Sequence, residues 1–188
     1  MIEELENRKW EVLSSRHIVQ RDEWLSIREE CVKLPNGVVI PSWYIFEFPD
    51  WINVIAITKE GRFVIIDQYR HAVQTTNYEL VAWVVDKGET PIQAAKRELL
   101  EETGYGKGQW SYFMHLSPNP TNHNNTSHTF LVKGVERISD QHLEKSEDIR
   151  VHLFTSIEVE QMLKENLIIQ ALHVAPLYKY LHERGTQN

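Results

Sequence analysis

Residues 88–105 read GETPIQAAKRELLEETGY, and this stretch decides the fold because it predicts one helix with complete start and stop signals. Thr90 can cap the helix, Pro91 suits its first position and Gln93 completes a capping box. Gly104 supplies the stop. The sequence therefore predicts a helix that begins after Thr90 and ends before Gly104.

The predicted helix has an apolar face and an acidic face beside it. The apolar face consists of Ile92, Ala95 and Leu99. The acidic face consists of Glu98, Glu101 and Glu102. Like charges at this spacing destabilise a helix by about 0.2–0.5 kcal/mol per pair, so the triplet requires an explanation. Three carboxylates from consecutive turns can hold Mg²⁺ and leave positions for water and substrate phosphates. The alternative is a solvated acidic face that Arg97 and Lys96 partly neutralise.

Glu89, seven further residues and then residues 97–105 resemble the Nudix box, G-x5-E-x7-R-E-U-x-E-E-x-G-U, in which U is a bulky aliphatic or aromatic residue. Eight of the nine specified positions match, and the exception is the opening glycine, which is Trp83 here. The resemblance implies a loop–helix–loop that binds divalent metal. It also implies substrates built as a nucleoside diphosphate linked to another group.

Length and composition agree with a globular protein. The 188 residues are enough for one domain of ordinary size or one domain with a small appendage, with 41% hydrophobic and 25% charged residues. The sequence contains no run of 18 apolar residues, so we expect no membrane span. The acidic start at residues 1–6 does not resemble a signal peptide. Cys31 is the only cysteine, so we expect no intramolecular disulfide and a reducing, cytoplasmic location.

The formal net charge of −7 argues against a non-specific nucleic-acid footprint. It also means that an anionic phosphate substrate is repelled unless a metal ion and local Arg or Lys reverse the field. Acidity and metal dependence are therefore mutually consistent.

The chain before the box is rich in β-branched and aromatic residues. We expect antiparallel strands at residues 10–20, 24–34 and 38–48, with a hairpin turn at residues 35–37. We expect the aromatic side chains of residues 42–48 to pack in the core rather than to contact a ligand or a second subunit. Pro49 and Asp50 break the pattern, which divides the chain into an N-terminal antiparallel sheet at residues 1–50 and a main domain at residues 51–188. Strands at residues 53–58 and 62–68 form a second hairpin.

Residues 67–73 and 77–89 resemble the ADP-ribose pyrophosphatase branch of the Nudix family, where Q-Y-R-x-A/G-V precedes E-L-P-A-G. In place of Pro-Ala-Gly this chain has Val81, Ala82 and Trp83, which predict an ordinary extended strand. The indole can crowd the site or stack on a base or ribose. Trp83 therefore bears on substrate identity more than on metal binding.

The resemblance implies a role for each matching residue. The metal ligands are Glu98, Glu101 and Glu102, with the carbonyl oxygen of Ala82 as a candidate additional ligand. Arg97 orients the box carboxylates by ion pairing. Arg70 meets substrate phosphate and Glu79 lies near the terminal sugar or nucleobase, with a surface ion pair as the alternative for each.

Two features lie beyond the box. Residues 143–152 resemble the acidic segment that supplies the general base, for which we favour Glu147, with Glu144 second and a solvated charge run as the alternative. The polar residues 117–128 occupy the position of the branch's S-P-G-x-T-x-E loop but lack its acid. Here His123 and His128 are candidates for proton transfer or metal binding, and a solvated loop is favoured.

The remaining predicted elements are a glycine-rich loop at residues 104–108, strands at residues 109–116 and 129–132, and two C-terminal helices. The first helix runs from the Thr155 cap to about residue 164, and the second from about residue 167 towards residue 181, with Pro176 as a kink or start.

These observations predict an α+β Nudix fold, in which an N-terminal antiparallel sheet precedes a mixed sheet between helices. The resemblance to the branch implies that the N-terminal sheet takes part in a homodimer. The predicted reaction is hydrolysis of a nucleoside diphosphate compound that depends on Mg²⁺, or on Mn²⁺. ADP-ribose or a nucleotide sugar would give a nucleoside monophosphate and a sugar phosphate. The alternatives are hydrolysis of another diphosphate, such as a dinucleotide or a coenzyme-A derivative, and a non-catalytic nucleotide-binding domain.

Overall fold

The computed structural model describes residues 5–21 and 25–185 of the chain, which divides into two compact units. One unit comprises Met1–Pro49 and Ser117–Asn125, and the other comprises Asp50–Leu116 and Thr126–Asn188. The acidic residues 1–4 and Trp24, the first residue predicted for the second strand, lie outside the described residues. In the described part of the chain, no helix is both long and apolar enough to cross a membrane.

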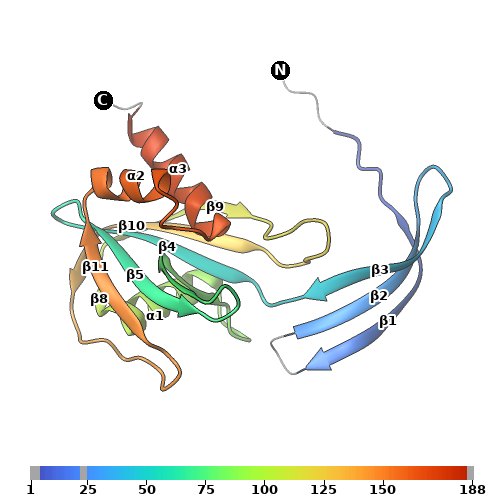
Figure 1. The fold of residues 1–188 in the computed structure, drawn as a ribbon, viewed down its shortest axis with the longest axis horizontal. Helices are drawn as coiled ribbons and strands as arrows, with labels where there is room; N and C mark the ends of the chain where they lie inside the picture. The colour runs from blue at the N-terminus through green and yellow to red at the C-terminus, as the bar shows by residue number, and fades with distance from the viewer. Residues whose placement is uncertain (1–4, 22–24, 186–188) are drawn as a thin grey trace. The chain divides into compact units, whose positions relative to one another are not determined.

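The N-terminal unit contains an antiparallel sheet in the order β1-β2-β3 (Figure 1). Its strands are β1 (Glu11–Arg21), β2 (Leu25–Lys33) and β3 (Val39–Glu47). The Gly37 N–H donates to the Leu34 carbonyl at 2.9 Å, and the Val38 N–H donates to Asn36 Oδ1 at 3.1 Å, which closes the β2–β3 hairpin. The three predicted antiparallel strands and their turn are confirmed.

The segment Ser117–Asn125 belongs to the N-terminal unit although it follows β9 in the sequence. The Phe46 N–H donates to the Asn122 carbonyl at 2.7 Å, and the Asn124 N–H donates to the Phe46 carbonyl at 3.3 Å. The His123 ring lies 5.8 Å from the ring of Phe46 and 5.0 Å from that of Phe48. After β9 and before β10, the chain therefore contacts the end of β3.

The main unit is built on a mixed sheet. The strands are β4 (Trp51–Thr58), β5 (Phe63–Arg70), β6 (Thr75–Glu79), β7 (Val81–Val84), β8 (Tyr105–Gly106), β9 (Gln109–Leu116), β10 (Ser127–Arg137) and β11 (Ile149–Phe154). The path β11-β5-β4-β10-β8 runs through the sheet, with β6 paired to β5, β7 to β4 and β9 to β10. β10 is parallel to β4, whereas the other pairs of this sheet are antiparallel. The predicted α+β class with a mixed sheet is confirmed.

The helix α1 (Pro91–Thr103) begins and ends where its capping signals predict. Gln93 Oε1 accepts hydrogen bonds from the Thr90 N–H at 2.9 Å and from the Thr90 hydroxyl at 2.6 Å. Gly104 adopts the left-handed conformation with φ of 72°, and its N–H donates to the Leu100 carbonyl at 2.8 Å. Glycine adopts this conformation without the steric cost that a Cβ atom imposes.

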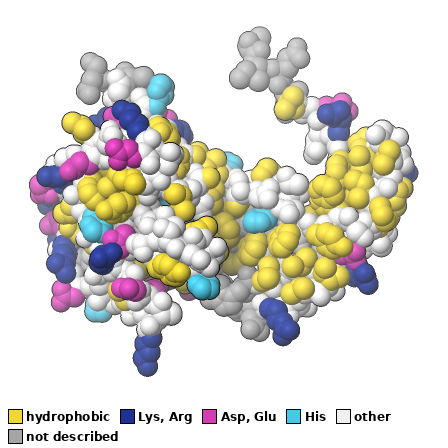
Figure 2. Space-filling model, in the orientation of Figure 1, with side chains coloured by type: hydrophobic (Ala, Val, Ile, Leu, Met, Phe, Trp, Pro, Cys, Tyr) yellow, Lys and Arg dark blue, Asp and Glu magenta, His cyan; other side chains and the backbone are white. Residues whose placement is uncertain are grey.

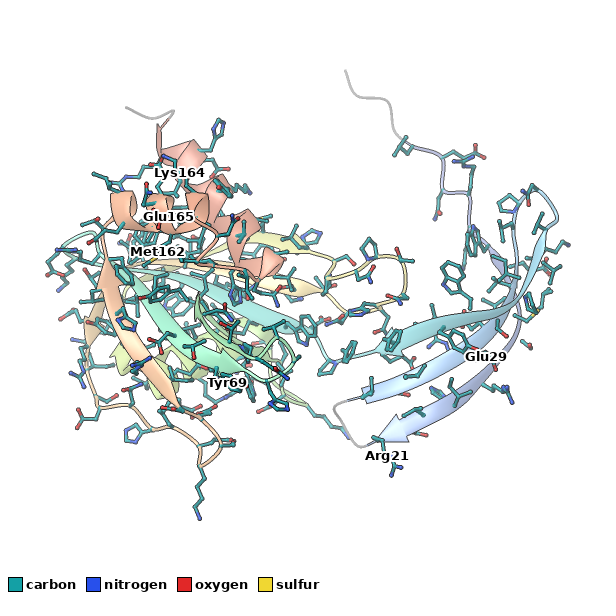
Figure 3. The ribbon with its side chains drawn as sticks, in the orientation of Figure 1. Arg21, Glu29, Tyr69, Met162, Lys164 and Glu165 are labelled. Atoms are coloured by element: carbon teal, nitrogen blue, oxygen red, sulfur yellow. The ribbon has the colours of Figure 1, made fainter. Side chains whose placement is uncertain are left out.

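The helices cover both faces of the main sheet (Figure 1), because alternate residues of its strands point to opposite faces. Val64 and Ile66 of β5 share a core cluster with α1, whereas Phe63 and Ile65 share a second cluster with α2 (Ser156–Lys164) and α3 (Ala171–Gly185). Figure 3 shows the same division at the end of α2, where Met162 faces the sheet, whereas Lys164 and the following residue Glu165 lie away from it.

Among the helices, α3 differs most from its predicted bounds. It begins at Ala171 and contains Pro176 in its interior. Proline lacks an N–H, so Pro176 cannot donate to the carbonyl of Leu172, four residues earlier. Asn53 of β4 donates to this carbonyl instead, through Nδ2 at 3.2 Å. The buried amide therefore satisfies the acceptor that proline leaves open.

Candidate active site

The helix α1 positions the acidic residues by burying its apolar face against the sheet. Ala95 and Leu99 are fully buried, and Ile92 packs against the same core cluster. This orientation takes Glu98 and Glu102 into the interior, where they are 3% and 2% exposed, whereas the Glu101 side chain is 45% exposed. The three predicted metal ligands therefore occupy different environments.

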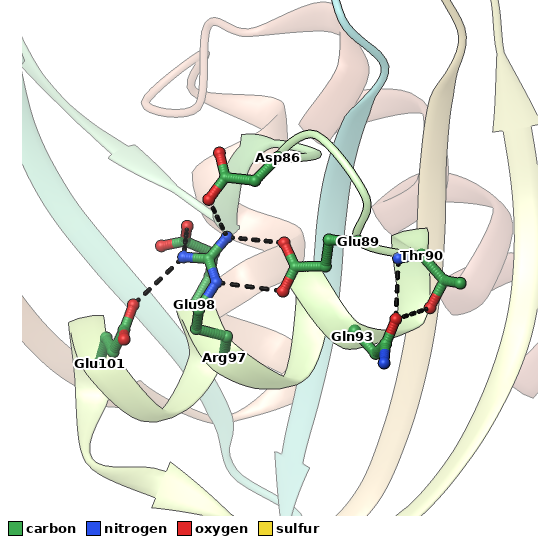
Figure 4. Close-up of polar contacts among 7 residues, drawn as sticks. All are labelled: Asp86, Glu89, Thr90, Gln93, Arg97, Glu98 and Glu101. Carbon is green, nitrogen blue, oxygen red and sulfur yellow. Dashed lines mark hydrogen bonds and ion pairs between the residues drawn. The ribbon is translucent and has the colours of Figure 1, made fainter.

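Arg97 joins the carboxylates around α1 (Figure 4). Its guanidinium donates to both oxygens of Glu89, through Nε at 3.1 Å and Nη2 at 2.9 Å. Nη1 donates to Glu98 and, at 3.2 Å, to Glu101 Oε2, and Nη2 lies 3.4 Å from Asp86 Oδ2. The hydrogen bonds that Arg97 donates to Glu89 are the main reason that the pKa of Arg97 is raised above its ordinary value. Arg97 therefore stays charged and orients carboxylates from both sides of the helix start.

Burial and mutual repulsion make Glu98 and Glu102 unusually basic. Burial raises the pKa of Glu98 to about 7, against the opposing effect of Arg97 and with further contributions from Glu101 and Glu147. Burial, followed by the charges of Glu98 and Glu147, raises the pKa of Glu102 well above its ordinary value. Glu102 Oε2 is also buried, and no group within residues 5–21 and 25–185 makes a hydrogen bond to it. A buried acid in this state favours binding either a proton or a cation.

This acidic site has the donor chemistry of a hard divalent cation, because its candidate side chains all offer carboxylate oxygens. Glu102 Oε2 supports this fit, since a cation would satisfy a buried carboxylate oxygen that receives no hydrogen bond from the described residues. Across residues 5–21 and 25–185, no three His, Cys, Asp or Glu side chains are arranged to surround a metal ion. The ion pairs of Arg97 with Glu98 and Glu101 explain this arrangement.

Arg70 and Glu79 form a bidentate ion pair next to Glu102. Arg70 Nε donates to Glu79 Oε1 at 2.8 Å, and Nη2 donates to Oε2 at 2.5 Å. Antiparallel pairing of β5 with β6 places both side chains on one face. The Glu79 side chain is 3% exposed and that of Arg70 is 39% exposed, so the guanidinium keeps an accessible part. The Arg70 charge lowers the pKa of Glu102, although burial, Glu98 and Glu147 outweigh it.

Trp83 and Ala82 lie in the strand β7, where the prediction of an ordinary extended conformation is confirmed. Trp83 pairs with Ile52 of β4, and Ala82 pairs with Asn53. Alternation along the strand places Trp83 on the same face as Val81, which packs in the core cluster of α1. Trp83 is partly exposed there.

The segment between β10 and β11 carries the two candidate bases. Glu147 is partly buried, and its carboxylate accepts a hydrogen bond from the Glu144 N–H at 2.8 Å. The Glu147 charge raises the pKa of Glu98 and of Glu102, which places its carboxylate near both box residues. Glu144 is exposed. Of the two candidate bases, Glu147 is the one whose charge acts on Glu98 and Glu102.

The two candidate histidines have structural contacts. The His123 ring packs at a tilt against the rings of Phe46 and Phe48 in the N-terminal unit. His128 lies in β10, where Nε2 is 3.2 Å from Asp50 Oδ2 and Nδ1 is 3.1 Å from the Tyr112 hydroxyl. Both ring nitrogens of His128 are therefore engaged within the main unit.

Sequence reasoning missed several residues around the acidic site. Asp86 and Glu89 were not identified as partners of Arg97, although Glu89 is a specified position of the box. Gln141 donates from Nε2 to the carbonyl of Glu102 at 2.6 Å, a contact across 39 residues that no local pattern indicates. His173 is buried in α3, and burial lowers its pKa to about 4. The spacing of Glu89 and Arg97 across the helix start was the one available signal.

Comparison with known proteins identifies the family of the chain. A model described as the NUDIX domain matches residues 48–176, and one described as the nucleoside diphosphate sugar hydrolase N-terminal domain matches residues 10–46. A methanol dehydrogenase activator from Bacillus methanolicus is 31% identical over 85% of this chain and 86% of its own. An ADP-ribose pyrophosphatase from Bacillus subtilis is 31% identical over 72% of this chain and 71% of its own.

A solved structure described as an ADP compounds hydrolase has the same fold, with a TM-score of 0.83 over 98% of this chain and 99% of its own, at 18% identity. The family model covers more than half of the chain and includes the whole acidic helix. The chain therefore belongs to the Nudix family and is a Nudix pyrophosphohydrolase, similar to the ADP-ribose pyrophosphatases.

Proposed function

We propose that this enzyme hydrolyses a nucleoside diphosphate linked to another group, with ADP-ribose or a nucleotide sugar as its substrate. The products would be a nucleoside monophosphate and a sugar phosphate. The observation that carries the proposal is the group of Glu98, Glu102 and Glu147. Burial and the Glu147 charge both raise the pKa of Glu98 and of Glu102, and Glu102 Oε2 is buried with no hydrogen bond from the described residues. The similarity to a Bacillus subtilis ADP-ribose pyrophosphatase supports this substrate class.

Nudix hydrolases generally use divalent metal ions. We propose Mg²⁺, with Mn²⁺ as a substitute, held by Glu98, Glu101, Glu102 and the carbonyl oxygen of Ala82. When bound, such an ion neutralises charge on the diphosphate and makes a water molecule more acidic.

The chain's own residues then have distinct tasks. Glu147 accepts the proton of the attacking water, and Glu144 is the second candidate for this task. The water oxygen bonds to phosphorus, the bond from phosphorus to the bridging oxygen breaks, and two phosphomonoesters leave. Arg70 offers the accessible part of its guanidinium to phosphate oxygens while Glu79 holds it in place. Arg97 keeps the box carboxylates oriented.

Substrate selection would involve Trp83 and Glu79. The Trp83 indole is partly exposed on the sheet face that α1 covers, and it can stack on a nucleobase or a ribose. Glu79 would act near the sugar or base through Arg70. These assignments make Trp83 a determinant of which diphosphate is hydrolysed.

We propose that residues 1–50 form a dimerisation and substrate region and that residues 51–188 form the hydrolase domain. Figure 2 shows hydrophobic side chains gathered over the N-terminal sheet, among which Val12, Leu13, Ile18, Val39 and Tyr44 are about half exposed. Apolar area of this kind favours an interface, and a second copy of the chain supplies one. Light scattering should give about twice the chain mass of 22.2 kDa. We also propose a cytoplasmic location, in keeping with the single cysteine.

The test is product release from a panel of ADP-ribose, nucleotide sugars, dinucleotides and coenzyme-A derivatives with Mg²⁺ or Mn²⁺. The wild type should hydrolyse ADP-ribose or a nucleotide sugar, and Glu102→Gln and Glu147→Gln should lower kcat by about a hundredfold or more. Glu165→Gln makes the same chemical change at the exposed residue that follows α2 and should keep wild-type kcat. Saturable binding without turnover of any compound would instead indicate a non-catalytic nucleotide-binding domain.

A further inference from the structure

The segment between β10 and β11 is fastened to the C-terminal end of α1. Ile138 and Ser139 donate their N–H groups to the Gly104 carbonyl at 2.8 and 3.2 Å. His142 donates its N–H to the Glu101 carbonyl at 2.8 Å. The last carbonyls of a helix have no partner within the helix, so these bonds satisfy acceptors that would otherwise need water.

Gln141 adds a connection that the backbone cannot make. Its Nε2 atom donates to the Glu102 carbonyl at 2.6 Å and to the Ile149 carbonyl at 3.2 Å. A side-chain amide has two N–H groups, so both can be used at once. One side chain therefore joins the end of α1 to the first residue of β11.

The two acceptors of Gln141 lie beside the residues assigned to the chemistry. Glu102 provides one carbonyl, and its own carboxylate has the unpartnered buried oxygen. Ile149 provides the other and follows Glu147 by two residues. Leu143, between Gln141 and Glu147, packs against the core cluster that contains the apolar face of α1. The residues on both sides of the candidate base are thus fixed to the helix that carries the box.

We propose that Gln141 is a positioning residue, whose two hydrogen bonds hold the Glu147 carboxylate in register with Glu98 and Glu102. This inference rests on the proposed function, in which Glu147 accepts the proton of the attacking water. An amide suits the task because it supplies two donors without a charge. A lysine or arginine here would add a second cation near carboxylates that Arg97 already neutralises.

Hydrogen exchange tests the structural half of the inference without any need for activity. Gln141→Leu removes both donors and keeps a side chain of similar length, and Gln141→Met is a second replacement in case the first folds poorly. His142→Ala is the matched control, because the contact of His142 with α1 is made by its backbone. The amides of residues 142 and 147 should exchange about tenfold faster in the Gln141 variants than in the wild type or the control. Equal exchange would overturn the inference.

Kinetics test the functional half. Gln141→Leu should lower kcat by about tenfold to a hundredfold and change KM by less than about twofold, because misplacing a reacting group affects the chemical step. In a Glu147→Gln background, Gln141→Leu should have little further effect, since both changes act on one carboxylate. Losses that multiply would show that Gln141 does not act through Glu147.

The outcomes separate this inference from the proposed function. A wild type that hydrolyses the panel, with Gln141→Leu at wild-type kcat, would refute the positioning role and leave the proposed function intact. A wild type that hydrolyses nothing would refute the proposed function and the positioning role together. Hydrogen exchange would then still show whether Gln141 fastens the segment to α1.

Discussion

Replacing Gly104 by alanine should damage both stability and catalysis, because two constraints meet at this residue. Gly104 adopts φ of 72°, a conformation that residues with a side chain rarely adopt. A Cβ atom at this position would also lie 2.2 Å from the Ser139 carbonyl oxygen and 3.1 Å from its carbonyl carbon. The helix end and the segment that carries Glu147 are therefore in direct contact at a position that admits no side chain.

The two constraints have different magnitudes. The left-handed conformation alone should lower the free energy of unfolding by about 1–2 kcal/mol for alanine. The contact requires Ser139 to retreat from 2.2 Å to at least 3.0 Å, a displacement of about 1 Å. Such a shift at a reacting group can lower a rate about a hundredfold. We therefore expect a loss of stability beyond the conformational cost and a fall in kcat of about tenfold to a hundredfold.

Gly61→Ala provides the control. Gly61 has φ of 78°, but no atom in the described part of the chain lies within 4 Å of a Cβ atom at this position, so the variant has the backbone strain without the contact. Urea unfolding followed by tryptophan fluorescence, together with steady-state hydrolysis, measures both quantities. Gly61→Ala should lose about 1–2 kcal/mol and keep wild-type kcat.

The reasoning would be refuted if Gly104→Ala lost no more stability than Gly61→Ala and kept wild-type kcat. That result would mean that the segment after β10 yields to the extra methyl group without moving Glu147.

Three further predictions concern charge. Burial holds the pKa of His173 at about 4, below its ordinary 6.5, so the unfolded chain binds more protons between these pH values. Stability that is fully present above pH 6.5 should fall by up to about 3 kcal/mol towards pH 4, and urea unfolding of His173→Leu should lack this part of the slope. Glu102→Gln should raise the melting temperature of the metal-free protein above pH 7, because the raised pKa of the buried acid makes its ionisation destabilising. Mg²⁺ should raise the melting temperature of the wild type more than that of the variant. Arg70→Lys replaces a fork by a point charge and should raise KM about tenfold in steady-state assays, and an unchanged KM would exclude Arg70 from phosphate binding.

The sequence predicted those parts of the fold that depend on local signals. α1 has a capping residue, a favourable first residue and a glycine stop, so its bounds follow from neighbouring residues. β6 and β8 were missed because one is polar and the other has two residues, and both are strands only through their partners. β11 was hidden because the acidic residues before it drew the interpretation towards a loop. Pro176 lies inside α3, and the Leu172 carbonyl that it leaves open accepts a hydrogen bond from Asn53, a residue far away in sequence.

The candidate site divides in the same way. The spacing of the box identified Glu98, Glu101 and Glu102, but spacing alone could not show that two are buried while the third is half exposed. The pairing of Arg70 with Glu79 follows from the register of β5 and β6, which no single-residue pattern specifies. Gln141 reaches the helix only because the sheet brings β11 beside β5 and so closes the intervening segment.

The two-part origin of the N-terminal unit has a consequence for the order of events on the ribosome. Residues up to Pro49 are synthesised first, but the segment Ser117–Asn125, which supplies the backbone partners of Phe46, is synthesised 76 residues later. At about 5–20 residues per second, synthesis of the chain from Pro49 to Asn125 takes roughly 4–15 s, and the unit is incomplete during this time. Translation of β4 to β9 fills that interval, so the nascent N-terminal sheet must tolerate several seconds with its final strand incompletely paired.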